Sequence, residues 1–480
     1  MSIISASRRQ RFGHYINTLN QFAASPLARL IVFGLFAVQS IVLAFVMHLG
    51  VPPDESNHIQ FIDYYAHHGL SPNLHGQTPT YYLGDKTREP DFMYHYLMSF
   101  VYRVTPLSVH YKYIFIRLLT VLLALAAFYV LTKIFKRIGF SETVTTVSLL
   151  ILTNLSMVLM MSAAVNNDVM VWLGVSLGIL FLLRLKERAN LTDLLSLALV
   201  IIWGGLFKRD LLPMSLLFGL LALFLIVRHW KVYAGTLKKI RPLSYLLIVL
   251  LILGSALFVE RIIGNIHDYG TVTPTCEQVQ GGESCSVFWA SLRAQQLALQ
   301  PKQNVSPPAF LAKWIGEDTY NIVNVQTQFW RRDVRPARWV TPVLTAVFLM
   351  GLAYGVYYEF SQRLKSDKHK GLRLYVLFIS LFYILSQLAV NYATFLHYRI
   401  FGLALNGRYV IPSLMLLVGF SCFYWTKALA NKRTAATLLA VGIILIVIAT
   451  SGLQLLLRNH QLYEVVNETA NVSPVPSYLQ

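Results

Sequence analysis

Long uncharged, mostly apolar runs alternate with short charged connections along most of the chain. The first run, Leu30–Gly50, follows three arginines and is too long for the core of a signal peptide, so it predicts a transmembrane helix. Ten further runs predict additional crossings: Leu118–Thr132, Thr143–Asn167, Val169–Leu183, Leu194–Phe207, Leu211–Val227, Pro242–Val259, Trp339–Tyr358, Leu374–His397, Tyr409–Thr426 and Thr434–Leu457. Since about 20 apolar residues span a bilayer as a helix, we expect an all-α, polytopic integral membrane protein with about eleven transmembrane helices.

Basic residues gather in every second short connection, as they do in loops that stay in the cytosol. This pattern predicts a cytosolic N-terminus, a C-terminus outside, and two long external loops, about 51–112 and 260–338, that contain interfacial helices. Aromatic residues that merely anchor the second loop are the simpler alternative. The basic residues are Lys133, Lys136, Arg137, Arg184, Lys186, Arg188, Arg228, Lys231, Lys238, Lys239, Arg241, Arg363, Lys365, Lys368, Lys370, Arg373, Lys427, Lys432 and Arg433.

Composition agrees with a membrane environment. The 480 residues are 55% hydrophobic and only 13% charged, and the mean hydropathy is +0.53, which excludes an ordinary water-soluble globule. The net charge of +19 would indicate nucleic acid in a soluble protein, but here it follows from cytosolic loops that face anionic lipid. We therefore expect membrane lipids, and no nucleic acid, among the partners.

The chain leaves the first predicted helix through two prolines and an acidic pair, Asp54 and Glu55, with His58 one helical turn further on. Carboxylates this close to a membrane need water, a cation or a substrate. Helix capping is an alternative role for Asp54, and a favourable dipole contact is one for Glu55. A lone interfacial histidine such as His58 is more often structural than functional.

Four short motifs in this order resemble the GT-C superfamily, polytopic glycosyltransferases that take a sugar from a polyprenyl-phosphate carrier. The resemblance covers roughly residues 30–430 and is closest to bacterial membrane proteins with "P-x-DE-x-x-H", "VNxD" and "GRYxxP" elements. The matching positions are Pro52, Asp54, Glu55 and His58; Val165, Asn166, Asn167 and Asp168; the basic Lys208-Arg209; and Gly407, Arg408, Tyr409 and Pro412.

The resemblance implies a division of the chain: a GT-C-like transmembrane catalytic module over 1–260 that includes external loop 51–112, a second external loop over 261–338, C-terminal transmembrane helices over 339–457 and an external tail over 458–480. Two positions depart from the family pattern. Glu89-Pro90-Asp91 stands where His-Pro-Pro is usual, and Lys208-Arg209 stands where a single Lys is commoner. The first departure puts an acceptor contact at that segment in doubt.

Lys208, Arg209 and Arg408 oppose the charge rule that the rest of the chain obeys, because short outer turns should be poor in basic residues. Cations there suit a donor phosphate that leaves as an anion. Snorkelling or pairing with Asp210 is the alternative for Lys208 and Arg209, and a structural ion pair is the alternative for Arg408.

The resemblance implies that Asp54 is the catalytic base, with Glu55 sharing the role or orienting the acceptor, and that transfer inverts the anomeric centre. Asp168, with Asn167 and His58, suits an acceptor or supporting position, although Asp168 can equally be a helix cap. Asp54 and Asp168 are the only suggested ligands for a metal, which would be loosely held Mg²⁺ or Mn²⁺; no tight metal site is indicated. Cys276 and Cys285 flank a glycine-containing segment and predict a disulfide on an oxidising outer face.

The leading hypothesis is a cell-membrane glycosyltransferase that acts on the extracytoplasmic side, with a polyprenyl-phosphate-linked sugar as donor and a glycan or lipid-linked acceptor from the cell envelope. A transporter or flippase of a lipid-linked saccharide is one alternative, and an oligosaccharide ligase or polymerase is another. Ionisable residues at outer helix ends instead of mid-span favour an enzyme over a transporter.

Overall fold

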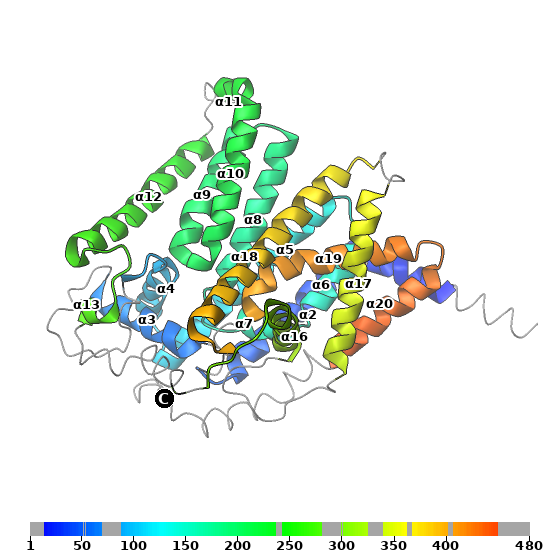
Figure 1. Cartoon of the computed structure of the whole chain (residues 1–480), viewed down its shortest axis with the longest axis horizontal. Coiled ribbons are helices and arrows are strands. Elements are labelled where there is room, and N and C mark those ends of the chain that lie inside the picture. Colours follow the sequence, from blue (N-terminus) through cyan, green and yellow to red (C-terminus); the bar gives the residue numbers. More distant parts are fainter. Residues whose placement is uncertain are drawn as a thin grey trace, which may run out of the picture.

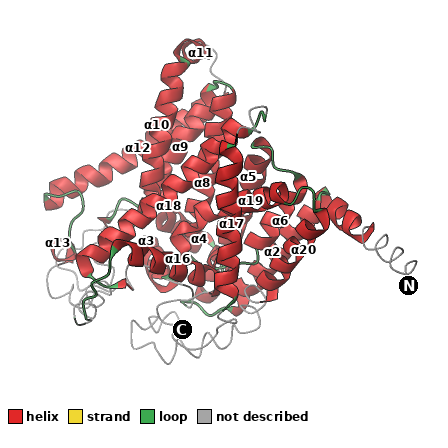
Figure 2. Cartoon of the chain, turned by 45° about the vertical axis from the view of Figure 1, so that its right-hand side comes forward, coloured by secondary structure: helices red, strands yellow, loops and turns green. Residues whose placement is uncertain are grey.

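The computed structural model describes residues 14–50, 52, 54–69, 88–236, 242–280, 299, 301–324, 339–361, 367–401 and 407–449. Every regular element within these ranges is a helix, as Figure 2 shows, and the predicted all-α class is confirmed there.

Eight helices of the described part are long and apolar enough to cross a membrane, so the chain is a multi-pass membrane protein. The eight are α2 (Pro26–Val46), α5 (Val109–Arg137), α8 (Asp168–Glu187), η2 with α10 (Arg209–Leu211 and Leu212–Arg228), α12 (Pro242–Tyr269), α17 (Val340–Phe360), α18 (Lys370–Tyr398) and η5 with α19 (Gly407–Val410 and Ile411–Ala428). Figure 1 shows how they are arranged.

Each of the eleven predicted runs contains a helix, but three do not form a single full-length span. The run 143–167 is divided into α6 (Glu142–Leu152) and α7 (Ser156–Ser162), which meet at 76° and together give a ninth candidate span. α9 (Leu191–Phe207) and α20 (Arg433–Val447) are shorter apolar helices. The 17 residues of α9 rise about 25 Å, less than the roughly 30 Å of a hydrocarbon core.

The bend between α6 and α7 has a local cause. The hydroxyl of Thr153 donates to Leu149 O at 2.8 Å, and the Asn154 amide donates to Leu150 O at 2.8 Å. Such side-chain bonds to the preceding turn compete with the helical ladder and bend helices. Leu155 then takes an extended conformation (φ −70°, ψ 129°), from which α7 starts in a new direction.

The two long connections also contain helices. α3 (Glu55–His68) and α4 (Met93–Val104) follow α2, whereas α13 (Cys276–Gln280) and α16 (Pro307–Asn324) lie between α12 and α17. α16 lies in the second long loop, for which the sequence predicts interfacial helices, and its Phe310 and Trp314 are buried against the rest of the protein. Phe329 and Trp330 lie outside the described residues.

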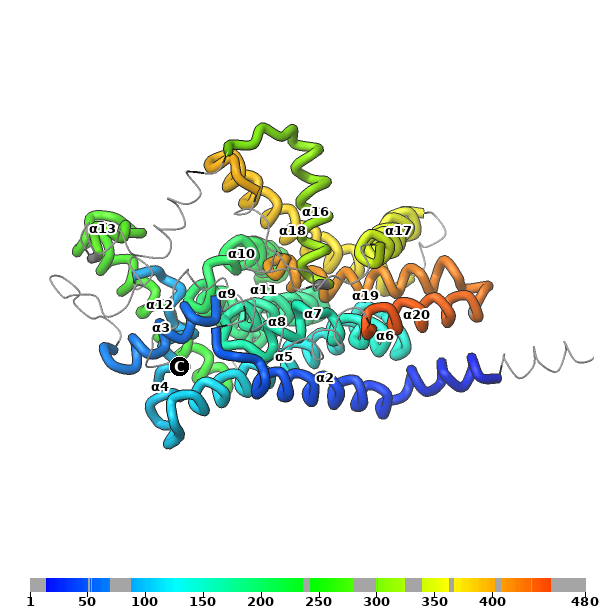
Figure 3. The backbone as a smooth tube through the Cα atoms, turned by 90° about the horizontal axis from the view of Figure 1, so that it is seen from below, coloured from blue at the N-terminus to red at the C-terminus, as the bar shows by residue number. Residues whose placement is uncertain are grey.

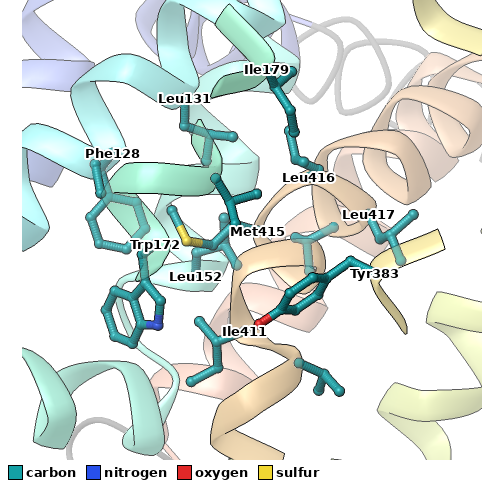
Figure 4. Close-up of a cluster of buried hydrophobic side chains, with 14 of the residues drawn as sticks. Phe128, Leu131, Leu152, Trp172, Ile179, Tyr383, Ile411, Met415, Leu416 and Leu417 are labelled. Carbon is teal, nitrogen blue, oxygen red and sulfur yellow. The ribbon is translucent and has the colours of Figure 1, made fainter. Parts of the chain in front are cut away.

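The centre of the bundle is a continuous apolar core where α5, α6, α8 and α19 meet (Figure 4). Trp172 of α8 and Met415 of α19 are almost completely buried in it, and Tyr383 enters from α18. Gly419 of α19 lets Phe135 of α5 approach closely, because an added Cβ would lie 2.3 Å from that ring. By contrast, α12 exposes most of its surface at the side of the bundle, as a helix that faces lipid would.

Contacts show which helix ends lie together. At one end, Arg137 closes α5 and pairs with Glu187, which closes α8. His369 Nδ1 lies 3.1 Å from Arg137 O there, and Lys186 donates to Gly371 O at 3.3 Å. The start of α8 is at the opposite end, so the basic connections and the acidic pair after α2 occupy different ends of the bundle. Which end faces the cytosol stays a prediction.

Candidate functional site

The turn from α2 into α3 places the two adjacent carboxylates on different sides. Gly50 takes a positive φ of 85° and donates its N–H to Glu55 Oε2 at 2.8 Å. Asp54 then adopts a left-handed conformation (φ 60°) directly before α3, and its side chain makes no capping hydrogen bond. Helix capping therefore does not account for Asp54.

Glu55 is completely buried, and both of its carboxylate oxygens accept hydrogen bonds. Arg117, from the first half of α5, donates Nε to Glu55 Oε1 at 2.8 Å and Nη2 to Oε2 at 2.6 Å. Oε1 also accepts the N–H of Val165 at 2.7 Å. Arg117 bonds the carbonyls of Met47 and His48 at the end of α2 as well. These contacts favour a positioning role for Glu55, which ties α2, α3, α5 and the turn before α8 together.

Asp54 points instead into a cluster of four charged side chains at one end of the bundle. Its Oδ2 accepts a hydrogen bond from Arg408 Nη2, and its side chain is 41% exposed. Arg408 Nε lies 3.5 Å from Asp168 Oδ2, and Lys208 Nζ pairs with Asp168 Oδ1. Asp168, Lys208 and Arg408 are buried. Carboxylates and cations thus alternate across the cluster, with Asp54 at its exposed side.

Each buried member of the cluster lies where a helix begins or ends. Asp168 opens α8, and its N–H bonds Asn166 Oδ1 at 2.6 Å. Lys208 ends α9, with its own N–H bonded to Gly204 O at 3.0 Å. Arg408 lies in η5, the turn that leads to the Pro412 start of α19. Three chain segments far apart in the sequence therefore converge because their helices end at the same level.

The charges determine the protonation of Asp54 and Lys208. Burial acts to raise the pKa of Asp54, but the charge and hydrogen bond of Arg408 outweigh it and hold that pKa well below its usual range. Burial likewise acts to lower the pKa of Lys208, but Asp168 and Asp210 hold that pKa above its usual range. Asp54 is therefore ionised and Lys208 charged throughout the neutral range.

Next to the cluster, His58 contacts a second histidine. His58 Nδ1 and His95 Nε2 are 2.7 Å apart, and the two rings stack with their centroids 5.0 Å apart. Burial lowers the pKa of His58 to about 3 and puts that of His95 well below its usual range. Both rings are neutral at pH 7, so the N–H of one ring donates a hydrogen bond to the unprotonated nitrogen of the other, and this bond links α3 to α4.

Arg209 does not accompany Lys208 into the cluster. Its side chain is 59% exposed, and its Nη1 donates to Glu89 Oε1 at 2.9 Å. Its backbone N–H lies 3.4 Å from Asp91 Oδ2. The two departures from the family pattern, at 89–91 and at 208–209, thus contact each other. The ion pair with Glu89 gives Arg209 a structural role, and this role needs both Glu89 and Arg209 to be present.

Of the remaining predicted residues, Asn167 and Cys276 lie in the described part of the chain and Cys285 does not. Asn167 is buried beside Asp168 and donates its amide to Phe207 O at 3.1 Å. Cys276 opens α13 and is disulfide-bonded, whereas Cys285 lies outside the described residues.

Within the described ranges, no three His, Cys, Asp or Glu side chains are grouped closely enough to hold a metal ion. Between Asp54 and Asp168, Arg408 already supplies the positive charge, so these residues do not fit Mg²⁺ or Mn²⁺.

Sequence reasoning missed Arg117 and His95. A signal for Arg117 was present, because it is a single charge that directly precedes the apolar run 118–132, and a charge at that depth needs a partner. His95 has no such signal, since it lies in an aromatic segment, Tyr94 to Tyr96, that reads as a packed helix.

Neither a family model nor a curated protein sequence matches the chain. The structure establishes a multi-pass, all-helical membrane protein. At one end of its bundle, Asp54, Asp168, Lys208 and Arg408 form a cluster of alternating charges, and only Asp54 is substantially open to solvent.

Proposed function

We propose that the chain is an integral membrane glycosyltransferase that moves a sugar from a polyprenyl-phosphate donor to a glycan or lipid-linked acceptor on the extracytoplasmic side, with a GT-C-like architecture. The observation that carries this proposal is the position of Arg408, whose guanidinium is shared between Asp54 and Asp168. A buried cation beside an accessible carboxylate combines the two groups that the reaction needs: an anion-binding side chain and a base.

In the proposed mechanism, the donor phosphate competes with Asp54 for Arg408. Arginine binds phosphate oxygens bidentately, and Lys208, held by Asp168, adds a second positive charge nearby. Asp168 keeps both cations in place while the phosphate is absent and is the positioning residue of the pair. Arg209, paired with Glu89 and facing solvent, is left out of the phosphate site.

Release from Arg408 also makes Asp54 a better base. Without its cationic partner, the carboxylate is expected to recover a pKa closer to its ordinary value, which strengthens its attraction for a proton. Asp54 then takes the proton of the acceptor hydroxyl as that oxygen bonds to the anomeric carbon. The bond from this carbon to the phosphate oxygen breaks on the opposite face, and polyprenyl phosphate leaves with the electron pair, so the configuration is inverted.

His58 and Asn167 border this reaction site. The buried Oδ1 of Asn167 accepts no hydrogen bond from any described residue and is available to an acceptor hydroxyl. His58, one turn after Asp54, is neutral and already engaged with His95, so we assign it to the shape of the site and not to proton transfer.

The test is transfer by the full chain in lipid nanodiscs, with short-chain polyprenyl phosphates that carry a panel of hexoses and pentoses. Asp54→Asn should lower turnover by at least about 1,000-fold, since the base is lost. It should bind the donor at least as tightly as the parent, since the carboxylate that competes with the phosphate for Arg408 is removed. Arg408→Ala should raise the donor Kd by at least about tenfold. Arg209→Ala is the matched control and should change neither quantity substantially.

Two results would contradict the proposal. Full turnover by a folded Asp54→Asn protein would remove Asp54 as the base. Movement of the intact lipid-linked sugar across the membrane of proteoliposomes that contain the protein, without transfer to an acceptor, would favour the transporter alternative.

A further inference from the structure

One face of α16 carries three buried polar side chains. Trp314, Asp318 and Asn321 follow each other at spacings of four and three residues, which places them in one row along a helix. All three are buried, and Asp318 is only 3% exposed. The flanking Phe310, Ile322 and Val323 pack into the apolar core, so the row lies on the inner side of the helix.

Four polar atoms of this row have no hydrogen-bond partner among the described residues. Trp314 Nε1, both carboxyl oxygens of Asp318 and Asn321 Oδ1 are buried and form no hydrogen bond with any described residue. More than nine in ten buried polar groups in proteins are paired, so four orphaned atoms on one helix face are far from the ordinary pattern. A structural role does not explain them, because each weakens the fold until something binds it.

The row adjoins the charged cluster. α16 packs against η5 so closely that a Cβ on Gly407 would lie 2.4 Å from the backbone O of Asp318 and 3.1 Å from Ile322. Only glycine fits there, and the next residue is Arg408. Figure 3 shows α16 reaching inward beside α18 and α17, in agreement with the ring contact between Phe310 and Tyr392 of α18. The backbone of the polar row therefore packs against the residue that directly precedes Arg408, a member of the proposed phosphate site.

The chemistry of the row selects the kind of ligand. Burial, followed by the charge of Glu317, raises the pKa of Asp318 to about 8, so at pH 7 this carboxyl group is mostly protonated and can both donate and accept. Trp314 donates and Asn321 accepts. None of the three is cationic, which disfavours a phosphate, and a single carboxyl beside an indole N–H disfavours a metal ion. A neutral polyhydroxyl compound matches all four atoms.

We propose that the inner face of α16, through Trp314, Asp318 and Asn321, binds the sugar ring of a saccharide substrate. This inference rests on the proposed glycosyltransferase function and assigns a sugar subsite to the same active region. The ring can belong to the donor or to the acceptor, since both present hydroxyl groups. Asp318 and Asn321 bond those hydroxyls, and Trp314 adds an N–H donor and an apolar ring surface.

The experiment compares the parent with Trp314→Phe and Asp318→Leu in nanodiscs, since leucine removes both the donor and the acceptor of the protonated carboxyl group. Glu317→Leu, the same loss of a carboxyl group one residue away, is the matched control. The donor arm measures the Kd of a short-chain bare polyprenyl phosphate and of its glucosyl, mannosyl and arabinosyl esters. The acceptor arm measures saturation transfer by NMR to the methyl glycosides of the same sugars. Asp318→Leu is expected to fold, because no described residue bonds the buried carboxyl group it replaces.

For a donor subsite, the parent prefers one of the sugar esters over the bare phosphate, and both variants reduce that preference by about tenfold with the Kd of the bare phosphate unchanged. For an acceptor subsite, the preference stays and the variants lose saturation transfer to a methyl glycoside. Variants that match the Glu317→Leu control in both arms would overturn the inference. Failure of the proposed function is distinct: the bare phosphate would then bind equally well to the parent and to Arg408→Ala.

Discussion

Asp54 and Glu55 are neighbours of the same chemical type with opposite surroundings. Both oxygens of Glu55 are bonded to Arg117 and to backbone N–H groups, and none of its surface is exposed. Asp54 has one cationic partner, a left-handed backbone and a side chain that is 41% exposed. Solvent screens part of the attraction between Asp54 and Arg408, so this pair can exchange partners, whereas the buried pair cannot.

This contrast predicts opposite effects of the same substitution. Glu55→Gln leaves the Arg117 guanidinium buried without its counter-charge and should lower the free energy of unfolding by about 3–5 kcal/mol. Asp54→Asn should lower it by less than about 1 kcal/mol and abolish sugar transfer instead. Thermal unfolding in nanodiscs, measured together with turnover, tests both statements. Equal losses of stability in the two variants would contradict the assignment of Glu55 to positioning.

At the residue scale, short motifs indicated Asp54, Asp168, Lys208 and Arg408, which the structure brings together. The partners of Glu55 and Arg209 were beyond local reasoning, because Arg117 is 62 residues from Glu55 and Glu89 is 120 residues from Arg209. Whether a carboxylate is available or occupied depends on such distant contacts. Spacing along the chain does not contain that information.

At the element scale, α3 and α4 form a helical pair that holds one side of the site. Ile59 and Ile62 of α3 pack with Tyr102 of α4 in one small apolar cluster, and Tyr65 packs with Met93 in another. The contact of His58 with His95 links the two helices beside the charged cluster. This linkage depends on the protonation state, since an imidazole that accepts a hydrogen bond cannot do so once it is protonated.

Acidification should therefore weaken the docking of α4 on α3. The folded chain holds the pKa of both rings below the ordinary 6.5, so the unfolded chain binds more protons as the pH falls below that value. The contribution of the two neutral histidines to the free energy of unfolding is complete above pH 6.5 and decreases below it, by at most about 2 kcal/mol per histidine at pH 5. Thermal midpoints at pH 7.5 and pH 5 measure the decrease.

His95→Gln should make that decrease smaller, because one of the two groups no longer titrates. Asp318 changes stability with the opposite sign, since its pKa is raised, but it contributes equally to the parent and the variant. His267→Gln, at a side chain that is 85% exposed, is the matched control and should leave the decrease as in the parent. An unchanged pH dependence in His95→Gln would show that the pair does not titrate as described.

Apolar runs predicted the existence of helices better than their ends. Each of the eleven runs contains a helix in its described part, because burial in lipid or in the bundle favours the same residues everywhere along a run. The bend after Leu152 was not predicted, since it results from two side-chain hydrogen bonds inside an uncharged stretch. The inward polar row of α16 was also missed, because its aromatic residues are equally typical of an interfacial helix.

For the whole molecule, the two ends of the bundle differ in their charged groups. At the end that holds the basic connections, Arg373 donates hydrogen bonds to Glu359 and to Asp367. These three charged groups pair with one another, which favours a structural role for them. The opposite end carries the cluster of Asp54, Asp168, Lys208 and Arg408. The proposed function requires such polarity, because the groups that act on a lipid-linked substrate must lie at one membrane surface.

The orientation of this polarity can be tested across a single helix. α18 runs from Lys370 to Tyr398. The N–H of Gln303 bonds the backbone O of Arg399 directly after the helix, whereas Lys368 lies two residues before its start. Because basic loops stay in the cytosol, a membrane-impermeant maleimide should label Gln303→Cys in intact cells and should not label Lys368→Cys until the cells are permeabilised. The parent chain gives the background from its own cysteines. Labelling of Lys368→Cys alone in intact cells would place the charged cluster in the cytosol and would remove the extracytoplasmic part of the proposed function.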